Sequence, residues 1–409
     1  MGPSLIDHGG IVPRYVISVT CCTGFLRKRV MMSVTYLDAA ATTRVDPRVA
    51  DVVLHWMTED FGNAGSRTHE YGARAKKAVQ QARTQLAAQL GASAEELIFT
   101  SGATESNNIA LLGMAPHGEQ TGRRHIITSA IEHKAVLEPL EHLQSRGFEV
   151  DFLRPDQHGR ISVEAVRERL RPDTLLVSLM HVNNETGVIQ PVSELGRILR
   201  ETSTYFHVDA AQGFAKLPQD LTAPIDLISI SGHKIGAPKG IGALLVRRRG
   251  WDRLPLQPLM FGGGQERKLR PGTLPVPLIM GLAKAEEIFR KEYQQWQAGA
   301  QQFREQLFAG LASTRYHVNG DPEHSVPHIL NLSFEGVDAE ALIIGLKGVA
   351  AVATGSACTS TSYTPSHVLT AMGLPDEIVS NGLRLSWLPS QVDGFEVGDL
   401  VAAVNQLQP

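Results

Sequence analysis

Short apolar runs alternate with amphipathic helical patterns from residue 95 onward, and this alternation constrains the fold more than any other feature of the chain. The runs are rich in β-branched residues and read "ELIFT", "HIITS", "TLLVSLMH", "YFHVDAA", "DLISISG" and "GALLVRR". Runs that are apolar throughout are typical of strands buried on both faces, and helical patterns cover residues 71–90, 135–146 and 163–171. We therefore expect an α/β fold with a mainly parallel central sheet.

The pattern changes after residue 275, where a long helical stretch over residues 276–311 leads into "HILNLSF", "VAAVATGSAC" and a terminal helix. This change indicates a second, smaller α+β domain. We expect a large domain over residues 46–285 and a small domain formed by residues 32–45 and 286–409. Residues 1–31 are predicted to be a disordered leader or upstream extension, because Met31 and Met32 stand directly before "SVTYLDAAATT". A secretory signal is not expected, since the basic cluster follows the apolar patch, the reverse of the order in such signals.

Composition excludes several classes of protein. The formal net charge of -3 provides no overall field that would draw the chain to nucleic acid or to a membrane surface. No apolar run approaches the roughly 20 residues that span a bilayer. The three cysteines, of which Cys21 and Cys22 are adjacent and Cys358 is distant, do not suit a disulfide framework or a four-ligand zinc site. We expect a cytoplasmic protein without a metal site.

Polar residues at the ends of the apolar runs suggest a ligand site, because ligands of open parallel sheets bind beyond the carboxyl ends of the strands. The turn 101–104 could hold a phosphate at a helix N-terminus, Asp209 could face a protonated ring nitrogen, and Lys234 could form a Schiff base. Taken singly, each has a plainer interpretation: an N-cap turn, a capping aspartate and a solvated lysine. Together they match the phosphate, ring nitrogen and aldehyde of pyridoxal 5'-phosphate.

Nine segments in order, covering nearly all of residues 36–390, resemble a cysteine desulfurase (NifS/IscS-like) of the class V aminotransferase group. They are "YLDAAATT", "FGNAGSRTHEYG", "FTSGATESNN", "IEHKAVLEPL", "MHVNNETGVIQP", "FHVDAAQ", "SGHKIGAPKGIGAL", "FGGGQERKLRPGTLPV" and "GSACTSTSYTPSHVL". The resemblance implies the fold-type I architecture of pyridoxal-phosphate enzymes and a homodimer. The stretch "MSVTYLDAAATTRVDP" is similar to the DNA phosphorothioation type (DndA-like).

The resemblance also implies a role for each residue that matches a family motif. Lys234 would bind the cofactor covalently, Asp209 would pair with the ring nitrogen, and Gln212 would hydrogen-bond the ring oxygen. His133 would stack over the ring and receive a proton, and Asn184 would lie near the ring oxygen and the substrate. The residues implied for the phosphate are Ala103, Thr104, Ser231, His233 and, from a second subunit, Thr273; those implied for the substrate are Arg384, Asn184 and Asn63.

Cys358 lies among small and hydroxylated residues in "VATGSACTSTS". A free cysteine is usually packed and inert, yet these neighbours favour a loop over a packed position. The resemblance implies that Cys358 takes sulfur from L-cysteine as a persulfide, releases L-alanine and passes the sulfur to an acceptor protein. The acceptor could serve iron-sulfur cluster assembly, tRNA thiolation or DNA phosphorothioation, and the absence of the C-terminal extension of the cluster-assembly enzymes favours a different acceptor from theirs.

Two rival functions remain open at this point. Another pyridoxal-phosphate enzyme of the same fold, such as a selenocysteine lyase or an aminotransferase, would share Lys234 and Asp209. A non-catalytic scaffold of a sulfur pathway is the second rival, although the complete cofactor set argues against it. The run Arg247 to Arg249 is interpreted as a solvated strand exit and not as a nucleic-acid patch.

Overall fold

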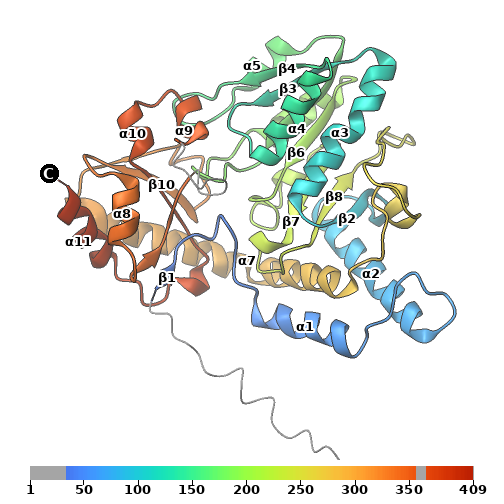
Figure 1. Cartoon of the computed structure of the whole chain (residues 1–409), viewed down its shortest axis with the longest axis horizontal. Coiled ribbons are helices and arrows are strands. Elements are labelled where there is room, and N and C mark those ends of the chain that lie inside the picture. Colours follow the sequence, from blue (N-terminus) through green and yellow to red (C-terminus); the bar gives the residue numbers. More distant parts are fainter. Residues whose placement is uncertain (1–33, 356–364, 409) are drawn as a thin grey trace, which may run out of the picture. The chain divides into compact units, whose positions relative to one another are not determined.

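Seven strands form the main sheet, in the order β2-β8-β7-β6-β5-β3-β4 (Figure 1). Their bounds are β2 Leu97–Thr100, β3 His125–Ser129, β4 Glu149–Leu153, β5 Thr174–Met180, β6 Tyr205–Asp209, β7 Leu227–Ser231 and β8 Gly242–Val246. Strands β3, β4, β5, β6 and β7 run parallel to one another. Strand β8 runs antiparallel to both β7 and β2. The prediction of an α/β fold with a mainly parallel sheet is confirmed.

The computed structural model describes residues 34–355 and 365–408. The predicted leader, residues 1–31, and the predicted nucleophile Cys358 lie outside these ranges. Residues from Val34 onward form one compact unit.

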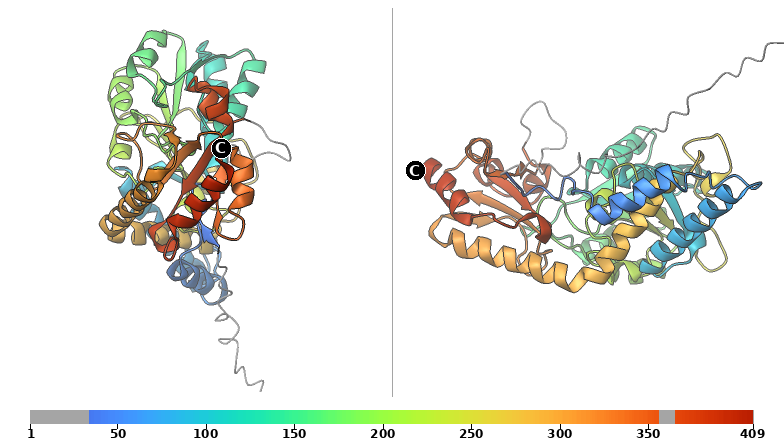
Figure 2. Two further views of the ribbon diagram at one scale, coloured as in Figure 1. Left: turned by 90° about the vertical axis from the view of Figure 1, so that its left-hand side faces the viewer. Right: turned by 90° about the horizontal axis from the view of Figure 1, so that it is seen from below.

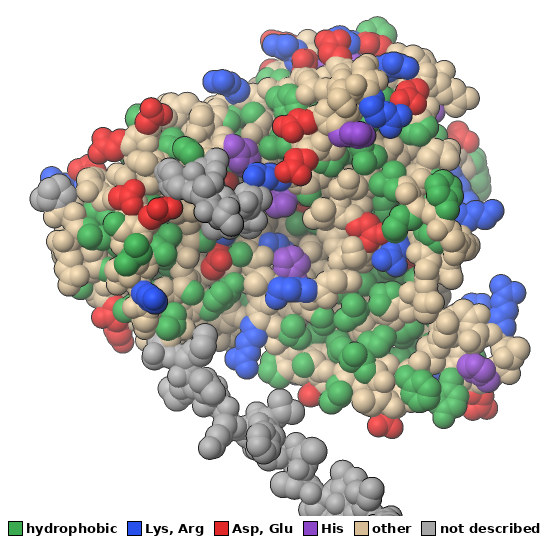
Figure 3. Space-filling view, in the orientation of Figure 1, with side chains coloured by type: hydrophobic (Ala, Val, Ile, Leu, Met, Phe, Trp, Pro, Cys, Tyr) green, Lys and Arg blue, Asp and Glu red, His purple; other side chains and the backbone are tan. Residues whose placement is uncertain are grey.

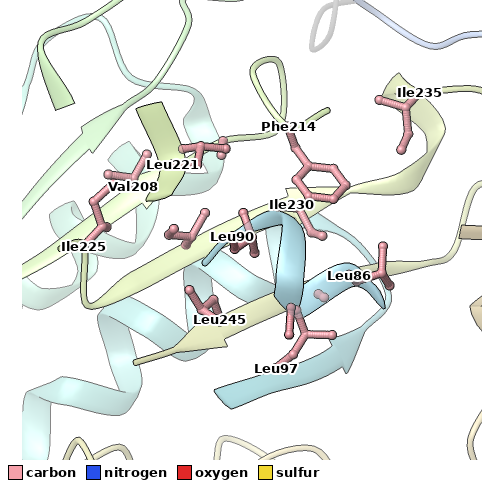
Figure 4. Packing of buried hydrophobic residues seen from close by; sticks show 14 of the residues in the cluster. Leu86, Leu90, Leu97, Val208, Phe214, Leu221, Ile225, Ile230, Ile235 and Leu245 are labelled. Carbon is pink, nitrogen blue, oxygen red and sulfur yellow. The ribbon is translucent and has the colours of Figure 1, made fainter. Parts of the chain in front are cut away.

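Helices cover both faces of the main sheet. One face packs against the helices α2, Glu70–Gln89, and α6, Val192–Arg200, and against the first half of α7, Val276–Gly310. Figure 4 shows this core, with Leu86 of α2 and Leu90, the residue that follows the helix, near Val208, Ile230 and Leu245 of the sheet. The other face packs against α3, Ala103–Thr121, and α4, Lys134–Ser145. Strands buried on both faces explain why the runs are apolar throughout.

A second sheet lies C-terminal to the main one, in the order β12-β13-β10-β9 with antiparallel pairs. Its strands are β9 Tyr316–Val318, β10 Ile329–Phe334, β12 Ala353–Thr354 and β13 Gly382–Ser386. The helix α7 joins the two parts: residues up to Phe289 belong to the main core, whereas Phe303 and Leu307 belong to the core of the second sheet. The right-hand view of Figure 2 shows α7 running along the two parts. The domain boundaries at residues 46 and 285 stay a prediction.

The remaining elements are short or peripheral. They are β1 Thr35–Tyr36, which pairs with β11 Ala350–Ala351, and the helices α1 Pro47–Thr58, α5 Val163–Arg169, α8 Ala339–Gly345, α9 His367–Ala371, α10 Asp376–Ser380 and α11 Val397–Leu407. The helix α1 starts where Asp46 accepts a hydrogen bond from the Arg48 N–H and Pro47 takes the first helical position, which is the arrangement expected of an N-cap. Over the described part of the chain, no helix is both long and apolar enough to cross a membrane.

Candidate active site

A cavity of about 400 Å³ opens at the carboxyl ends of β5, β6 and β7, facing the N-terminus of α3. Near the middle of the face in Figure 3, histidine side chains lie beside lysine or arginine side chains. Ten of the residues predicted from the sequence line this cavity: Ala103, Thr104, His133, Asn184, Asp209, Gln212, Ser231, His233, Lys234 and Arg384. They come from segments spread over 282 positions of the chain, from residue 103 to residue 384.

Two predicted residues lie elsewhere. Thr273 is exposed, in the segment between the second half of the main sheet and α7, and it does not line the cavity of its own chain. Asn63 is also exposed, and its Oδ1 accepts a hydrogen bond from the Gly65 N–H in a local turn. Its predicted contact with the substrate therefore has no support in the placement of this residue.

Lys234 follows β7 directly, in the short helix η4, Gly232–Lys234. Its Nζ donates hydrogen bonds to the Ala40 carbonyl at 2.5 Å and the Ala41 carbonyl at 2.8 Å, which fix the amine at the cavity. A second lysine, Lys216, is almost completely buried, and burial together with the charge of Lys234 lowers the pKa of its amine to about 7.

Asp209 ends β6 and is only 6% exposed. Its Oδ2 accepts from Asn107 Nδ2 at 2.7 Å, and its Oδ1 accepts from the Ala211 N–H at 2.9 Å. These two hydrogen bonds hold the carboxylate in place at the end of β6. Asn107 was not predicted from the sequence; its place in the second turn of α3 gives no sign that it reaches a strand end 102 positions later.

A second carboxyl, that of Glu132, lies close to Asp209 and is fully buried. Its Oε1 accepts from Ser129 Oγ at 2.5 Å and from the Met180 N–H at 2.9 Å. Burial, with a smaller contribution from the charge of Asp209, raises the pKa of Glu132 to about 8, against the effect of the two hydrogen bonds. Glu132 is therefore protonated at neutral pH.

The turn before α3 has the geometry of an anion site. Gly102 has a φ of 154°. A Cβ on Gly242 of β8 would lie 2.6 Å from the Gly102 Cα, so the two backbone segments approach each other closely only because both residues lack a side chain. The nineteen-residue helix α3 begins at Ala103, where free N–H groups and the helix dipole favour a phosphate. Ser231 and His233 line the same end of the cavity. Burial, then the nearby lysines, lower the pKa of His233 to about 4.

Arg384, on β13, is 1% exposed although it is charged. Its Nη2 donates to Asp38 Oδ1 at 2.6 Å, and its Nη1 donates to the Asn184 carbonyl at 3.1 Å. Its Nε finds no hydrogen-bond partner among the described residues. A buried guanidinium that lines the cavity and has an Nε–H donor unpaired within the described residues could bind the carboxylate of a substrate.

His133 is the N-cap of α4: its Nδ1 accepts a hydrogen bond from the Ala135 N–H at 3.0 Å. An accepting Nδ1 assigns the proton of the neutral ring to Nε2. Burial is the main reason that the pKa of His133 is lowered, and Lys234 and His367 lower it further, against Asp209 and Glu138. His133 thus both caps α4 and lines the cavity.

These residues fit pyridoxal 5'-phosphate. The cavity combines an anion-binding turn, a buried carboxylate and a lysine amine, and the buried Gln212 Oε1 has no partner within the described ranges, so a polar group of a ligand could satisfy it. Across residues 34–355 and 365–408, no three His, Cys, Asp or Glu side chains are grouped so that they could hold a metal ion.

Comparison with known proteins identifies the family. The model of the family "Aminotransferase class-V" matches residues 35–391, and the chain belongs to this family. Cysteine desulfurase IscS of Anaeromyxobacter dehalogenans is 48% identical over 352 residues, which cover 85% of this chain and 86% of that protein. The resemblance to the cysteine desulfurases, and with it the pyridoxal-phosphate dependence of this enzyme class, is confirmed.

Solved structures agree with this placement. The crystal structure of DndA from Streptomyces lividans is 72% identical in sequence, with a TM-score of 0.77, and the match covers 87% of this chain and 99% of that one. A structure of SspA in complex with cysteine is 40% identical, also with a TM-score of 0.77, and the coverage is again 87% and 99%.

Proposed function

We propose that this cysteine desulfurase withdraws sulfur from L-cysteine with Lys234, Asp209, Arg384 and Cys358 in the principal roles. The observation that carries this assignment is the convergence of the first three on one cavity, where each keeps the chemical group that its role requires. A carboxylate-binding guanidinium, a carboxylate for a ring nitrogen and an amine for an aldehyde lie together.

The steps at the cavity follow from these groups. Arg384 holds the substrate carboxylate through the donors that Asp38 and Asn184 leave to it. Asp209, which Asn107 and the Ala211 N–H hold at the cavity, would face the ring nitrogen. Bound pyridoxal phosphate supplies an electron sink for the pair left when the substrate Cα loses its proton. Lys234, displaced by the substrate amine, carries that proton.

His133 lines the cavity, which supports its predicted place near the ring, but its role as the N-cap of α4 constrains the predicted role as a proton recipient. Because Nδ1 accepts from Ala135, a further proton would require the loss of that hydrogen bond. We therefore propose that His133 contacts the cofactor ring and donates from Nε2, and that Lys234 moves the proton of Cα.

Sulfur transfer requires a nucleophile, which we assign to Cys358. Its thiolate attacks the sulfur of the substrate; the new S–S bond forms as the bond between that sulfur and the substrate Cβ breaks. The electron pair of the broken bond stays with the carbon skeleton, which takes up protons and leaves as L-alanine. The enzyme is left with a Cys358 persulfide, whose outer sulfur passes to an acceptor protein.

We further propose a cytoplasmic homodimer. A free catalytic thiol suits a reducing compartment. Thr273 lies away from its own cavity, which supports the prediction that it reaches the phosphate site of a second subunit. Earlier in the same segment between β8 and α7, Phe261 is 86% exposed, and Leu259 and Met260 are 40% and 46% exposed. These three residues form an apolar surface that a second subunit would cover. The 72% identity with DndA favours the DndA-like type of acceptor pathway.

Mass spectrometry after incubation of the pyridoxal-phosphate-loaded enzyme with L-cysteine tests the assignment. We expect one added sulfur on Cys358, and Cys358→Ala should retain the visible absorbance of the bound cofactor but form no persulfide. Lys234→Ala should lose that absorbance and produce no L-alanine. Persulfide on another residue would overturn the assignment of Cys358, and sulfur release by Cys358→Ala would favour a selenocysteine lyase type of mechanism. A wild-type protein that never binds the cofactor would favour the scaffold.

A further inference from the structure

The carboxylate of Glu185 contacts both ends of the segment that contains Cys358. Glu185 directly follows Asn184 of the cavity and is only 2% exposed. The last described residue before the segment is Gly355, and the first residues after it are Pro365, Ser366 and His367. Sequence reasoning did not single out Glu185, because nothing in "HVNNETG" relates it to residues about 180 positions later.

On the C-terminal side, the contacts are one hydrogen bond and one close approach. Ser366 Oγ donates to Glu185 Oε2 at 2.5 Å, and His367 Nδ1 lies 4.0 Å from Glu185 Oε1. His367 is fixed from its other side, since Nε2 donates to the Glu132 carbonyl at 3.0 Å. Ser366 is also the N-cap of α9, where its Oγ accepts from the Leu369 N–H at 3.1 Å.

On the N-terminal side, the contact is steric. A Cβ on Gly355 would lie 1.9 Å from Glu185 Oε2 and 2.5 Å from Glu185 Cδ, so the carboxylate rests directly on the Gly355 backbone. Glu185 is itself held firmly: its N–H donates to Asn183 Oδ1 at 2.9 Å, and its carbonyl accepts from Asn331 Nδ2 at 3.4 Å. One rigidly placed carboxylate therefore determines where both flanks lie relative to Asn184.

From these contacts we infer that Glu185 is a positioning residue for sulfur transfer, which fixes the flanks of the Cys358 segment against the cofactor cavity. This inference rests on the proposed function of Cys358. Glu185 does not contact the reacting atoms; it acts through Gly355, Ser366 and His367. Its loss should therefore slow the attack of Cys358 on the substrate sulfur and leave the earlier steps, at Lys234 and Arg384, unchanged.

The test separates these steps in the full-length, cofactor-loaded enzyme. Glu185→Ala is expected to lower kcat for L-alanine formation by on the order of tenfold, as expected for loss of a charge-assisted hydrogen bond, with KM for L-cysteine within about threefold of wild type. The absorbance change on adding L-cysteine should keep its rate, whereas the persulfide on Cys358 should form about tenfold more slowly. Glu185→Gln, which keeps the shape, covers the case in which the alanine variant does not fold.

Ser366→Ala should show the same split between kcat and KM. Because both substitutions disable one contact, the losses in the Glu185→Ala/Ser366→Ala double variant should not multiply. Ser162→Ala is the matched control: Ser162 caps α5 through the same bond to an N–H three residues on, away from the cavity, and its loss should leave kcat unchanged.

Hydrogen exchange supplies a readout that does not depend on turnover. In the protein without substrate, Glu185→Ala should speed exchange of the Leu369 amide by roughly tenfold, and Ser162→Ala should not. The inference is overturned if kcat of Glu185→Ala stays within twofold of wild type, or if the absorbance response to L-cysteine slows as much as persulfide formation does. A wild-type enzyme that forms no persulfide on Cys358 would instead refute the proposed function.

Discussion

Replacing Glu132 by glutamine is expected to stabilise the folded protein at neutral pH, by an amount that grows as the pH rises. In the unfolded chain this carboxyl ionises near its ordinary pKa of 4.5, whereas in the folded protein burial raises the pKa to about 8. Between these values the folded state holds a proton that the unfolded state has released, so stability falls with increasing pH. Each unit costs about 1.4 kcal/mol, which gives about 3 kcal/mol at pH 7.

Glutamine removes this cost without removing the contacts. Its Oε1 can still accept from Ser129 Oγ and the Met180 N–H, and its amide nitrogen takes the place of Oε2, which has no hydrogen-bond partner in the described part of the chain. Below pH 4.5 the carboxyl is protonated in both the folded and the unfolded state and does not affect the free energy of unfolding. Above pH 8 the loss of stability reaches its full value. The gain from Glu132→Gln should therefore be small at pH 5 and largest near pH 8.5.

Urea or thermal unfolding of both proteins at pH 5, 7 and 8.5 measures this difference. Glu138→Gln serves as the control, because Glu138 is exposed on the neighbouring helix α4 and its replacement should change stability little at any pH. A gain that is the same at all three pH values would refute the reasoning, because it would arise from packing and not from a buried proton. A wild-type protein more stable than Glu132→Gln at pH 8.5 would refute it directly.

Three further predictions concern the charged groups of the site and of its support. Arg384→Lys replaces a planar fork by a point charge and should raise KM for L-cysteine by about 10- to 100-fold in steady-state kinetics, with a smaller change in kcat. Asp209→Asn should lower kcat by about 100-fold, while absorbance titration still detects cofactor binding through the phosphate turn and Lys234. Arg83→Met should lower the stability measured by thermal unfolding by about 3–5 kcal/mol, because it leaves the buried Glu266 carboxylate without its partner. In the wild type, Arg83 Nη1 and Nη2 donate to this carboxylate at 2.7 and 2.5 Å.

The central strands and long helices were predictable because their patterns are strong. The helix predicted over 276–311 ends at Gly310, and that predicted over 71–90 covers Glu70–Gln89. Strand β4 was missed, since "EVDFL" lies at the edge of the sheet and mixes exposed and buried positions. The arginines after β8 are not a simple solvated exit: Arg247 donates to three backbone carbonyls, and Arg249 pairs with Asp226 at 2.6 Å.

The site was predictable only in part, for a related reason. Lys234 and Asp209 follow apolar runs directly, and the topology of a parallel sheet brings such positions to one edge. Their supporting residues carry no local signal, because each acts across the fold. Asn107 reaches Asp209 over 102 positions and Asp38 reaches Arg384 over 346, so only the folded chain reveals the pairs.

One turn explains why the cavity is assembled from both sheets. It follows β5 and is closed by Asn183 Oδ1, which accepts from the N–H groups of Glu185 and Thr186. Its Asn184 carbonyl accepts from Arg384 of β13, and its Glu185 carbonyl accepts from Asn331 of β10. The turn thus ties the end of a main-sheet strand to two strands of the second sheet. A shift of the second sheet would move Arg384 together with Asn184, because the Asn184 carbonyl binds the Arg384 side chain. The same turn presents the Glu185 carboxylate to Gly355 and Ser366, on the two flanks of the Cys358 segment. With the roles that we propose for Arg384 and Cys358, one short element would therefore align the substrate carboxylate, the cofactor cavity and the thiol.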